Sequence, residues 1–142
     1  MDSPTVTVRG KAASLAQEIE VGRHRLAADE PASVGGADTG PNPYDLLLAA
    51  LGACKSITVT LYAQRKKWPL ESVSVRLRHD KVHADDCESC ESRDVLLDRI
   101  ECEVEFSGQL TAEQRGRLFE IANRCPVHRT LTSEIVIESR LA

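Results

Sequence analysis

Cys54 and Cys125 are the residues of this sequence best suited to carry chemistry. Each lies on the apolar face of a predicted helix, so both thiols should point toward one core. Pro126 predicts that Cys125 is the N-cap of a short helix, where free N–H groups and the helix dipole lower a thiol pKa. With Arg124 beside it and His128 one turn along, Cys125 is favoured as the more acidic thiol. Inert packing is the alternative for each cysteine, because free thiols are often buried.

The other cysteines offer a second kind of chemistry. Cys87 and Cys90 form one Cys-x-x-Cys pair in a polar connection, with His83 and His79 before it. If the hairpin turns near Ser89, Cys102 falls on the returning strand opposite Arg76 or a near neighbour, about 20 Å from this tip at roughly 3.3 Å per residue. A three-ligand zinc site, a redox pair and an exposed loop without a fixed role all stay open. No metal site is assigned, because structural zinc usually takes four ligands.

Three short strands are predicted at the N-terminus, followed by a loop and a long helix. Alternating residues predict strands at Thr5 to Arg9, Glu18 to Val21 and His24 to Ala28. The segment 29–42 is rich in Gly and Pro and is typical of a functional loop. Asn42 and Pro43 are a helix N-cap and first turn, and the helix should continue to about Arg65.

The second half of the chain predicts a β-hairpin, two helices and a strand. Period-two alternation marks the hairpin strands at 72–78 and 100–106. Thr111 and Gln114 form a capping box that starts a second helix, and a short helix follows Cys125. Glu134 to Ser139 is predicted as a closing strand. The result is an α+β fold, with residues 1–142 as a single domain.

One face of the long helix is predicted to be buried. The expected stripe consists of Leu47, Leu51, Cys54, Thr58 and Leu61. Lys55, by contrast, is assigned to the part of the helix that reaches water, together with Gln64, Arg65 and Lys66. Because the first half is apolar nearly all round, the helix needs more cover than a small sheet provides, which favours a homodimer.

Composition excludes several classes of protein. The 142 residues carry a formal net charge of −4, so no nucleic-acid partner is expected. The longest strongly apolar run, Leu46 to Cys54, is about half of the roughly 20 residues that span a bilayer. Residues 1–4 lack the features of a secretory signal, so we expect a cytoplasmic protein whose odd number of cysteines does not form a disulfide framework.

Three segments together resemble the OsmC/Ohr family. They are GGADTGPNPYDLLLAALGAC at 35–54, YAQRK at 62–66 and CPVHRTL at 125–131. The resemblance implies a two-layer α+β fold in an intertwined homodimer with active sites at the subunit interface. It also implies a thiol peroxidase that needs no cofactor, in which Cys54 attacks the peroxide and Cys125 resolves the product.

The chain departs from the family's peroxidases near the predicted helix start. Those enzymes carry a glutamate directly after the Asn-Pro pair and an arginine in the N-terminal region. Here Tyr44 follows the pair, Asp45 comes next, and Arg25 or Arg9 would have to supply the arginine. This Tyr-Asp form with a Cys-Pro-Val-His ending resembles a less characterised branch, some members of which are appended to α/β-hydrolase domains.

The sequence therefore predicts reduction of organic hydroperoxides, or of hydrogen peroxide, through a Cys54 sulfenic acid and a Cys54–Cys125 disulfide. An external dithiol would reopen the disulfide. Asp45, Tyr44, Arg25 and His128 are the further site candidates, with His128 as a polar wall of the thiol pocket. The alternative is a non-enzymatic module that binds a small molecule, with the cysteines as packing or reporter thiols.

Overall fold

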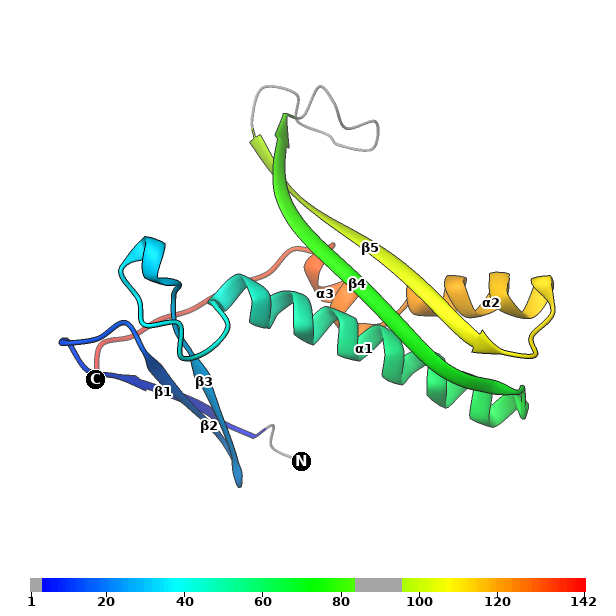
Figure 1. Cartoon of the computed structure of the whole chain (residues 1–142), viewed down its shortest axis with the longest axis horizontal. Helices are drawn as coiled ribbons and strands as arrows, with labels where there is room; N and C mark the ends of the chain where they lie inside the picture. The colour runs from blue at the N-terminus through cyan, green and yellow to red at the C-terminus, as the bar shows by residue number, and fades with distance from the viewer. Residues whose placement is uncertain (1–3, 84–95) are drawn as a thin grey trace. The chain divides into compact units, whose positions relative to one another are not determined.

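A computed structural model describes residues 4–83 and 96–142 of the chain (Figure 1). The chain forms two compact units, Met1–Leu47 and Leu48–Ala142, which we describe separately. Helix α1, Pro43–Lys66, begins in the first unit and continues through the second. Strands, a long helix, a hairpin and two further helices follow one another as the sequence predicts, and the mixed α+β class is confirmed.

The first unit contains a three-stranded antiparallel meander. Its strands are β1 (Val6–Gly10), β2 (Gln17–Val21) and β3 (His24–Ala28), in that order across the sheet. Gly22, with φ of 56°, makes the tight turn between β2 and β3. The predicted strands are confirmed to within one residue at each end, because short alternating segments around a turn already define their pairing.

The loop after β3 closes around one buried carboxylate. Asp29 is only 2% exposed and accepts hydrogen bonds from the amides of Glu30, Ala37 and Thr39 and from the Thr39 hydroxyl. These donors, led by the Thr39 hydroxyl, lower the pKa of Asp29 to about 2. A β-carbon at Gly36 would collide with the Glu30 carbonyl, so the loop requires glycine there. The structural role of this loop is to bury and satisfy Asp29, with a short 3-10 turn, Ala32–Val34, inside it.

Acid is expected to loosen this loop through Asp29. Because folding lowers its pKa from 3.8 to about 2, the stabilisation is complete above the higher value and disappears as the pH falls through the lower one. The protection of the Thr39 amide against hydrogen exchange, taken relative to the intrinsic rate at each pH, should therefore fall between pH 4 and pH 2. An Asp29→Asn chain should show lower protection at neutral pH and little further loss of protection over this range. The exposed neighbour provides the control, since Asp38→Asn should keep the wild-type acid response.

Helix α1 starts and stops at strong local signals. The Asn42 side chain accepts from the Asp45 amide at 2.8 Å, and the Asp45 carboxylate accepts from the Asn42 amide at 3.2 Å. At the other end Lys67 adopts a left-handed conformation, with φ of 56°, and the Trp68 amide donates to the Ala63 carbonyl. The predicted start at Pro43 is confirmed, and the helix ends one residue beyond the expected Arg65.

The buried face of α1 differs from the predicted stripe. Leu51, Lys55, Val59 and Ala63 are the buried residues that repeat every fourth position, whereas Leu47 and Leu61 are exposed. Lys55 is only 1% exposed, so its assignment to the solvent side is wrong. The face is selected by the hairpin, which approaches so closely that a β-carbon on Gly52 would lie 2.8 Å from Leu77 Cδ1.

Length and composition alone would allow α1 to cross a bilayer, a test that buried helices of soluble proteins also pass. The expectation that the apolar run from Leu46 to Cys54 is too short to span a bilayer therefore does not hold for the whole helix. Val59 and Ala63 instead pack with Phe106, Leu118 and Ala122 in the core of the second unit. These contacts identify α1 as a core helix.

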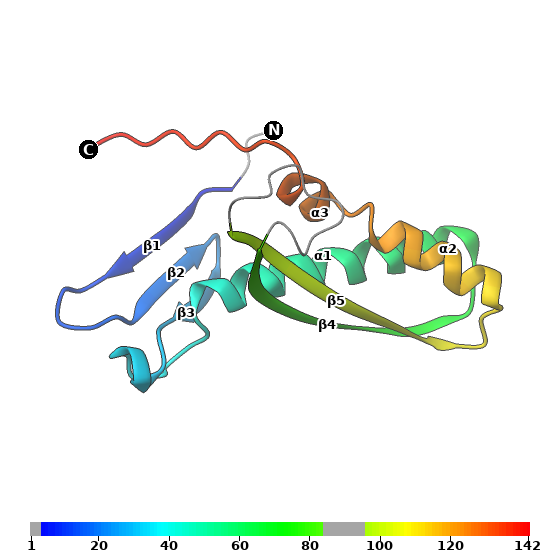
Figure 2. The ribbon, with the colours of Figure 1, turned by 90° about the horizontal axis from the view of Figure 1, so that it is seen from above.

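The second unit is built on a long antiparallel hairpin of β4 (Leu70–His83) and β5 (Leu96–Gly108). The hairpin runs diagonally along α1, and α2 (Ala112–Ala122) lies beside the C-terminal half of α1 (Figures 1 and 2). Cys102 pairs with Leu77, one position from the Arg76 expected from the sequence. The Thr111–Gln114 capping box is confirmed in both directions.

After α3 (Pro126–Leu131) the chain runs to its C-terminus without regular structure. The predicted strand from Glu134 to Ser139 is therefore wrong for this chain by itself. The three consecutive β-branched residues Ile135, Val136 and Ile137 favour a strand, but a strand also needs a neighbour to receive its backbone hydrogen bonds. Ile135, Val136 and Ile137 are left exposed.

Candidate thiol site

The structure brings Cys54 and Cys125 to one place in the second unit. Cys54 Sγ accepts from the Val127 amide at 3.4 Å, and Cys125 Sγ accepts from the next amide, His128 N, also at 3.4 Å. Two consecutive amides of α3 thus donate to the two sulfur atoms, and the neighbouring Cys54 thiol raises the pKa of Cys125. Both cysteines are free.

Local sequence explains how each thiol is positioned. Cys54 is one residue along α1 from the buried Lys55, which leaves its side chain at the edge of the buried face and partly exposed. Cys125 is the N-cap of α3, with Pro126 in the first turn, as predicted. A cap residue directs its side chain back onto the first turn of its helix, which places the Cys125 sulfur over the His128 amide.

Burial makes Cys125 a weak acid, contrary to the prediction from its helix position. Cys125 has no exposed surface, and burial raises the pKa of its thiol above the ordinary value. The His128 amide lowers this pKa, the neighbouring Cys54 thiol raises it and the charge of Lys55 lowers it, but burial is the largest effect. The N-cap amide is present as expected, yet desolvation of the thiolate outweighs it.

Lys55 is the residue of this site that sequence reasoning missed. Its Nζ donates to the Ala122 carbonyl at 3.2 Å and to Asn123 Oδ1 at 3.2 Å, and lies 2.9 Å from His128 Nδ1. These three acceptors match the three N–H bonds of an ammonium group. The sequence holds only a weak signal for it: Lys55 lies four residues after Leu51 and four before Val59, but the apolar stripe expected from the sequence includes Leu51 and not Val59.

His128 is held in one tautomer by Lys55. If Lys55 donates to Nδ1, the ring proton is assigned to Nε2, and the imidazole is neutral. Burial lowers the pKa of His128, and the positive charge of Lys55 lowers it further. His128 is therefore a neutral hydrogen-bonding group at pH 7.

A cavity of about 210 Å³ adjoins this group. It is lined by Leu51, Asp98, Ile100, Cys102, His128, Leu131 and Thr132. The lining is largely apolar, and burial raises the pKa of the Cys102 thiol in its wall. The cavity can accept a small molecule with an apolar group and places it against His128.

The other predicted site residues lie in the first unit, where each has structural contacts. Arg25 pairs with Glu20 at 3.3 Å, and Arg9 pairs with the same carboxylate at 2.9 Å. Asp45 caps α1 through Asn42, and Tyr44 is exposed. The structure therefore gives Arg25, Arg9 and Asp45 partners on the sheet or at the helix start.

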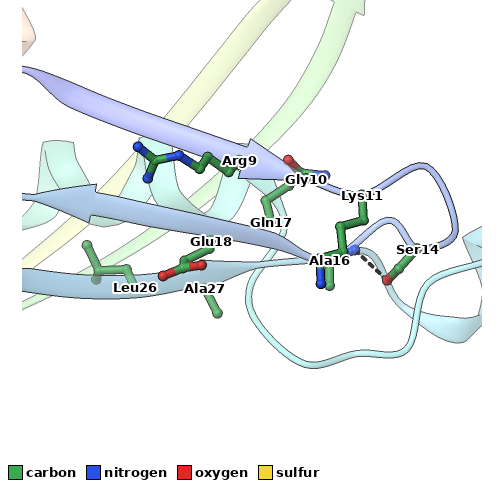
Figure 3. A pocket seen from close by; sticks show the side chains of 9 residues that line it. All are labelled: Arg9, Gly10, Lys11, Ser14, Ala16, Gln17, Glu18, Leu26 and Ala27. Atoms are coloured by element: carbon green, nitrogen blue, oxygen red, sulfur yellow. Dashed lines mark hydrogen bonds between the residues drawn. The ribbon is translucent and has the colours of Figure 1, made fainter.

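A hollow of about 440 Å³ lies on the meander of the first unit. Figure 3 shows its lining: Arg9, Gly10, Lys11, Ser14, Ala16, Gln17, Glu18, Leu26 and Ala27. The Ser14 hydroxyl in this lining accepts a hydrogen bond from the Ala16 amide at 3.1 Å. This arrangement stabilises a turn and supplies no activated nucleophile.

No cluster of three His, Cys, Asp or Glu side chains suited to a metal ion occurs within residues 4–83 and 96–142. Cys87 and Cys90 lie outside the described residues. Of the two histidines considered with them, His79 bonds Asp98 Oδ1 at 2.8 Å through Nε2.

The chain is therefore a small α+β protein in which two free thiols lie on neighbouring amides. A family model described as OsmC-like protein matches residues 35–140, and the chain belongs to this OsmC/Ohr family. No curated protein sequence matches the chain.

Solved structures share the fold at low sequence identity. An OsmC-like protein from Mycoplasma pneumoniae has a TM-score of 0.71 at 18% identity, over 92% of this chain and 87% of that one. The organic hydroperoxide resistance protein OsmC from Legionella pneumophila has a TM-score of 0.66 at 18% identity, over 93% and 90%. The organic hydroperoxide resistance protein OhrB of Bacillus subtilis has a TM-score of 0.62 at 19% identity, over 92% and 91%.

Proposed function

We propose that the protein is a thiol peroxidase that reduces organic hydroperoxides with Cys54 and Cys125. The observation that carries this proposal is the meeting of the two sulfur atoms on consecutive amides of α3. Membership of a family whose structural neighbours are named for organic hydroperoxide resistance supports a role in peroxide stress. The difference in exposure of the two thiols assigns their roles.

Cys54 is the attacking thiol, because it is partly exposed whereas Cys125 is fully buried. The Cys54 thiolate attacks the terminal oxygen of the hydroperoxide, the O–O bond breaks, and the alkoxide takes a proton and leaves as an alcohol. Sulfur is oxidised by two electrons and becomes a sulfenic acid, while the peroxide is reduced.

Cys125 then resolves the sulfenic acid. Its thiolate attacks the Cys54 sulfur, the S–O bond breaks, and the departing hydroxide combines with the proton from Cys125 to form water. The product is a Cys54–Cys125 disulfide. An external dithiol reduces it to two thiols and is itself oxidised to a disulfide, so the cycle needs no metal or flavin.

The cavity beside His128 favours an organic substrate over hydrogen peroxide. Leu51, Ile100 and Leu131 can receive an alkyl group, and His128 supplies a hydrogen bond. We propose that the residues 1–142 work as one domain in a reducing cytoplasm, where dithiols are available. Tyr44, Asp45 and Arg25 stay candidates for a role in the cycle, which the losses of peroxide turnover in Tyr44→Phe, Asp45→Asn and Arg25→Gln chains would measure.

The proposed homodimer explains the exposed C-terminal segment. Ile135 and Ile137 are 51% and 84% exposed, and such a β-branched segment can form a strand against a second copy. Sedimentation equilibrium should give about twice the chain mass of 15.6 kDa. The double variant Ile135→Ser, Ile137→Ser should shift the protein toward monomer, whereas Glu134→Gln with Glu138→Gln should not. A monomeric wild type contradicts the dimer.

The peroxidase proposal is tested with the purified protein, a dithiol and tert-butyl hydroperoxide. Peroxide should disappear catalytically, and without the dithiol each chain should lose two hydrogens in a disulfide that peptide mapping places between Cys54 and Cys125. The same assay with hydrogen peroxide should be slower. Unchanged thiols after treatment would contradict the peroxidase and favour a non-enzymatic binding module.

A further inference from the structure

Lys55 and Cys125 are both buried at one corner of the second unit, and the proposed peroxidase cycle assigns a role to Cys125 only. Lys55 and Cys125 are 1% and 0% exposed. Transfer of an ammonium group from water into a protein interior is costly unless a counter-charge or a full set of hydrogen bonds compensates it. None of the ion pairs found among the described residues includes Lys55.

The partners of Lys55 surround Cys125 in the chain. Ala122 and Asn123 precede Cys125 by three and two residues, and His128 follows it by three. The ammonium group is therefore held at the α2–α3 corner where Cys125 lies. All three partners are neutral, so the positive charge at this corner has no permanent counter-ion among them.

We propose that Lys55 is the positioning residue for Cys125: its buried ammonium provides the positive charge that stabilises the Cys125 thiolate while the disulfide closes. This inference rests on the proposed peroxidase cycle and assigns Lys55 to its second step. The thiolate is the counter-ion that the site otherwise lacks, and it forms only when resolution requires it.

The surrounding groups support this assignment. The titratable groups around this corner include Cys54 on α1, Cys102 on β5 and His128 on α3, and Asp98 of β5 lines the same cavity as Cys102 and His128. The charge of Lys55 lowers the pKa of Cys125, of Cys102 and of His128, whereas Asp98 is held by His79 and Lys81. At this corner it opposes burial, which alone would leave Cys125 protonated and slow to attack.

The proposal predicts a defect in resolution rather than in peroxide attack. A Lys55→Met chain keeps the length and volume of the side chain without its charge. After one equivalent of tert-butyl hydroperoxide, closure of the disulfide should slow by at least about tenfold at pH 7, the effect of one unit in pKa. Sulfenic acid trapped with dimedone should accumulate, and peroxide loss in the first turnover should change little. Lys66→Met, at an exposed position of the same helix, is the matched control.

A second measurement needs no peroxide. It uses a chain with Cys54→Ser and Cys102→Ser, in which the ¹³Cβ resonance of Cys125 is followed as a function of pH. The midpoint of this titration should move to higher pH when Lys55→Met is added, and also when Lys55→Gln is added. If Lys55 only ties α2 to α3, both variants should lower the melting temperature and leave this titration unmoved, which would overturn the proposal. A wild type that consumes no peroxide overturns the proposed function instead, so the two failures are distinguishable.

Discussion

A Cys54→Ser chain should consume no hydroperoxide above the buffer rate. The expected loss is at least about a thousandfold, the scale on which removal of a catalytic nucleophile acts. A serine hydroxyl fits the same space beside the Val127 amide but cannot form a sulfenic acid. Peroxide loss followed with a dithiol in excess measures the effect directly.

Cys102→Ser is the matched control for this prediction. Cys102 is also partly buried and lies in the wall of the cavity, but burial raises the pKa of its thiol, and within residues 4–83 and 96–142 it is a free cysteine. Its replacement should leave turnover within about twofold, since it removes no group of the proposed cycle. Equal loss in both variants would show that the assay reports the fold and not the attacking thiol.

A Cys125→Ser chain should keep the first peroxide turnover and turn over slowly after it. The burst should equal one peroxide per chain, because Cys54 still forms its sulfenic acid. Steady-state turnover should then fall by at least about tenfold, since a dithiol from solution must replace a thiol held at high effective concentration. Rapid-quench mass spectrometry should find a sulfenic acid on Cys54 and no loss of two hydrogens.

This variant also tests the assignment of roles. If Cys125 were the attacking thiol, as its N-cap position alone would favour, Cys125→Ser would abolish the burst and Cys54→Ser would preserve it. The structure opposes that assignment because Cys125 has no exposed surface and its pKa is raised. An exchange of the two phenotypes would therefore contradict the proposed order of steps.

Two charged residues of the family's peroxidases are not matched at the start of α1 or in the first unit. The sequence lacks the glutamate after Asn42-Pro43, and Asp45 at the neighbouring position is used to cap α1. Arg25 pairs with Glu18 and Glu20 on the meander. In the second unit, the charge of Lys55 lowers the pKa of Cys125 from within α1 itself.

The sequence by itself determined the elements of this protein and the residues at their ends. Asn42, Pro43, Thr111 and Cys125 are caps or first-turn residues as predicted, because capping depends on contacts within a few residues. The hairpin strands also follow from local alternation, whereas their register differs by one place, because Cys102 pairs with Leu77 and not with Arg76. The two cysteines were identified in the same way, from their helix positions.

Only the tertiary structure decided which face of α1 is buried and how acidic Cys125 is. Lys55 is buried and Leu61 is exposed, the reverse of the prediction, because β4 and α2 pack on the face of α1 that carries Lys55. These are contacts between distant segments, and the spacing of apolar residues within α1 does not specify them. The pKa of Cys125 reverses its predicted direction for the same reason, since desolvation depends on everything packed around the sulfur. The C-terminal segment fails to form its predicted strand because the strand needs a partner that the described chain does not provide.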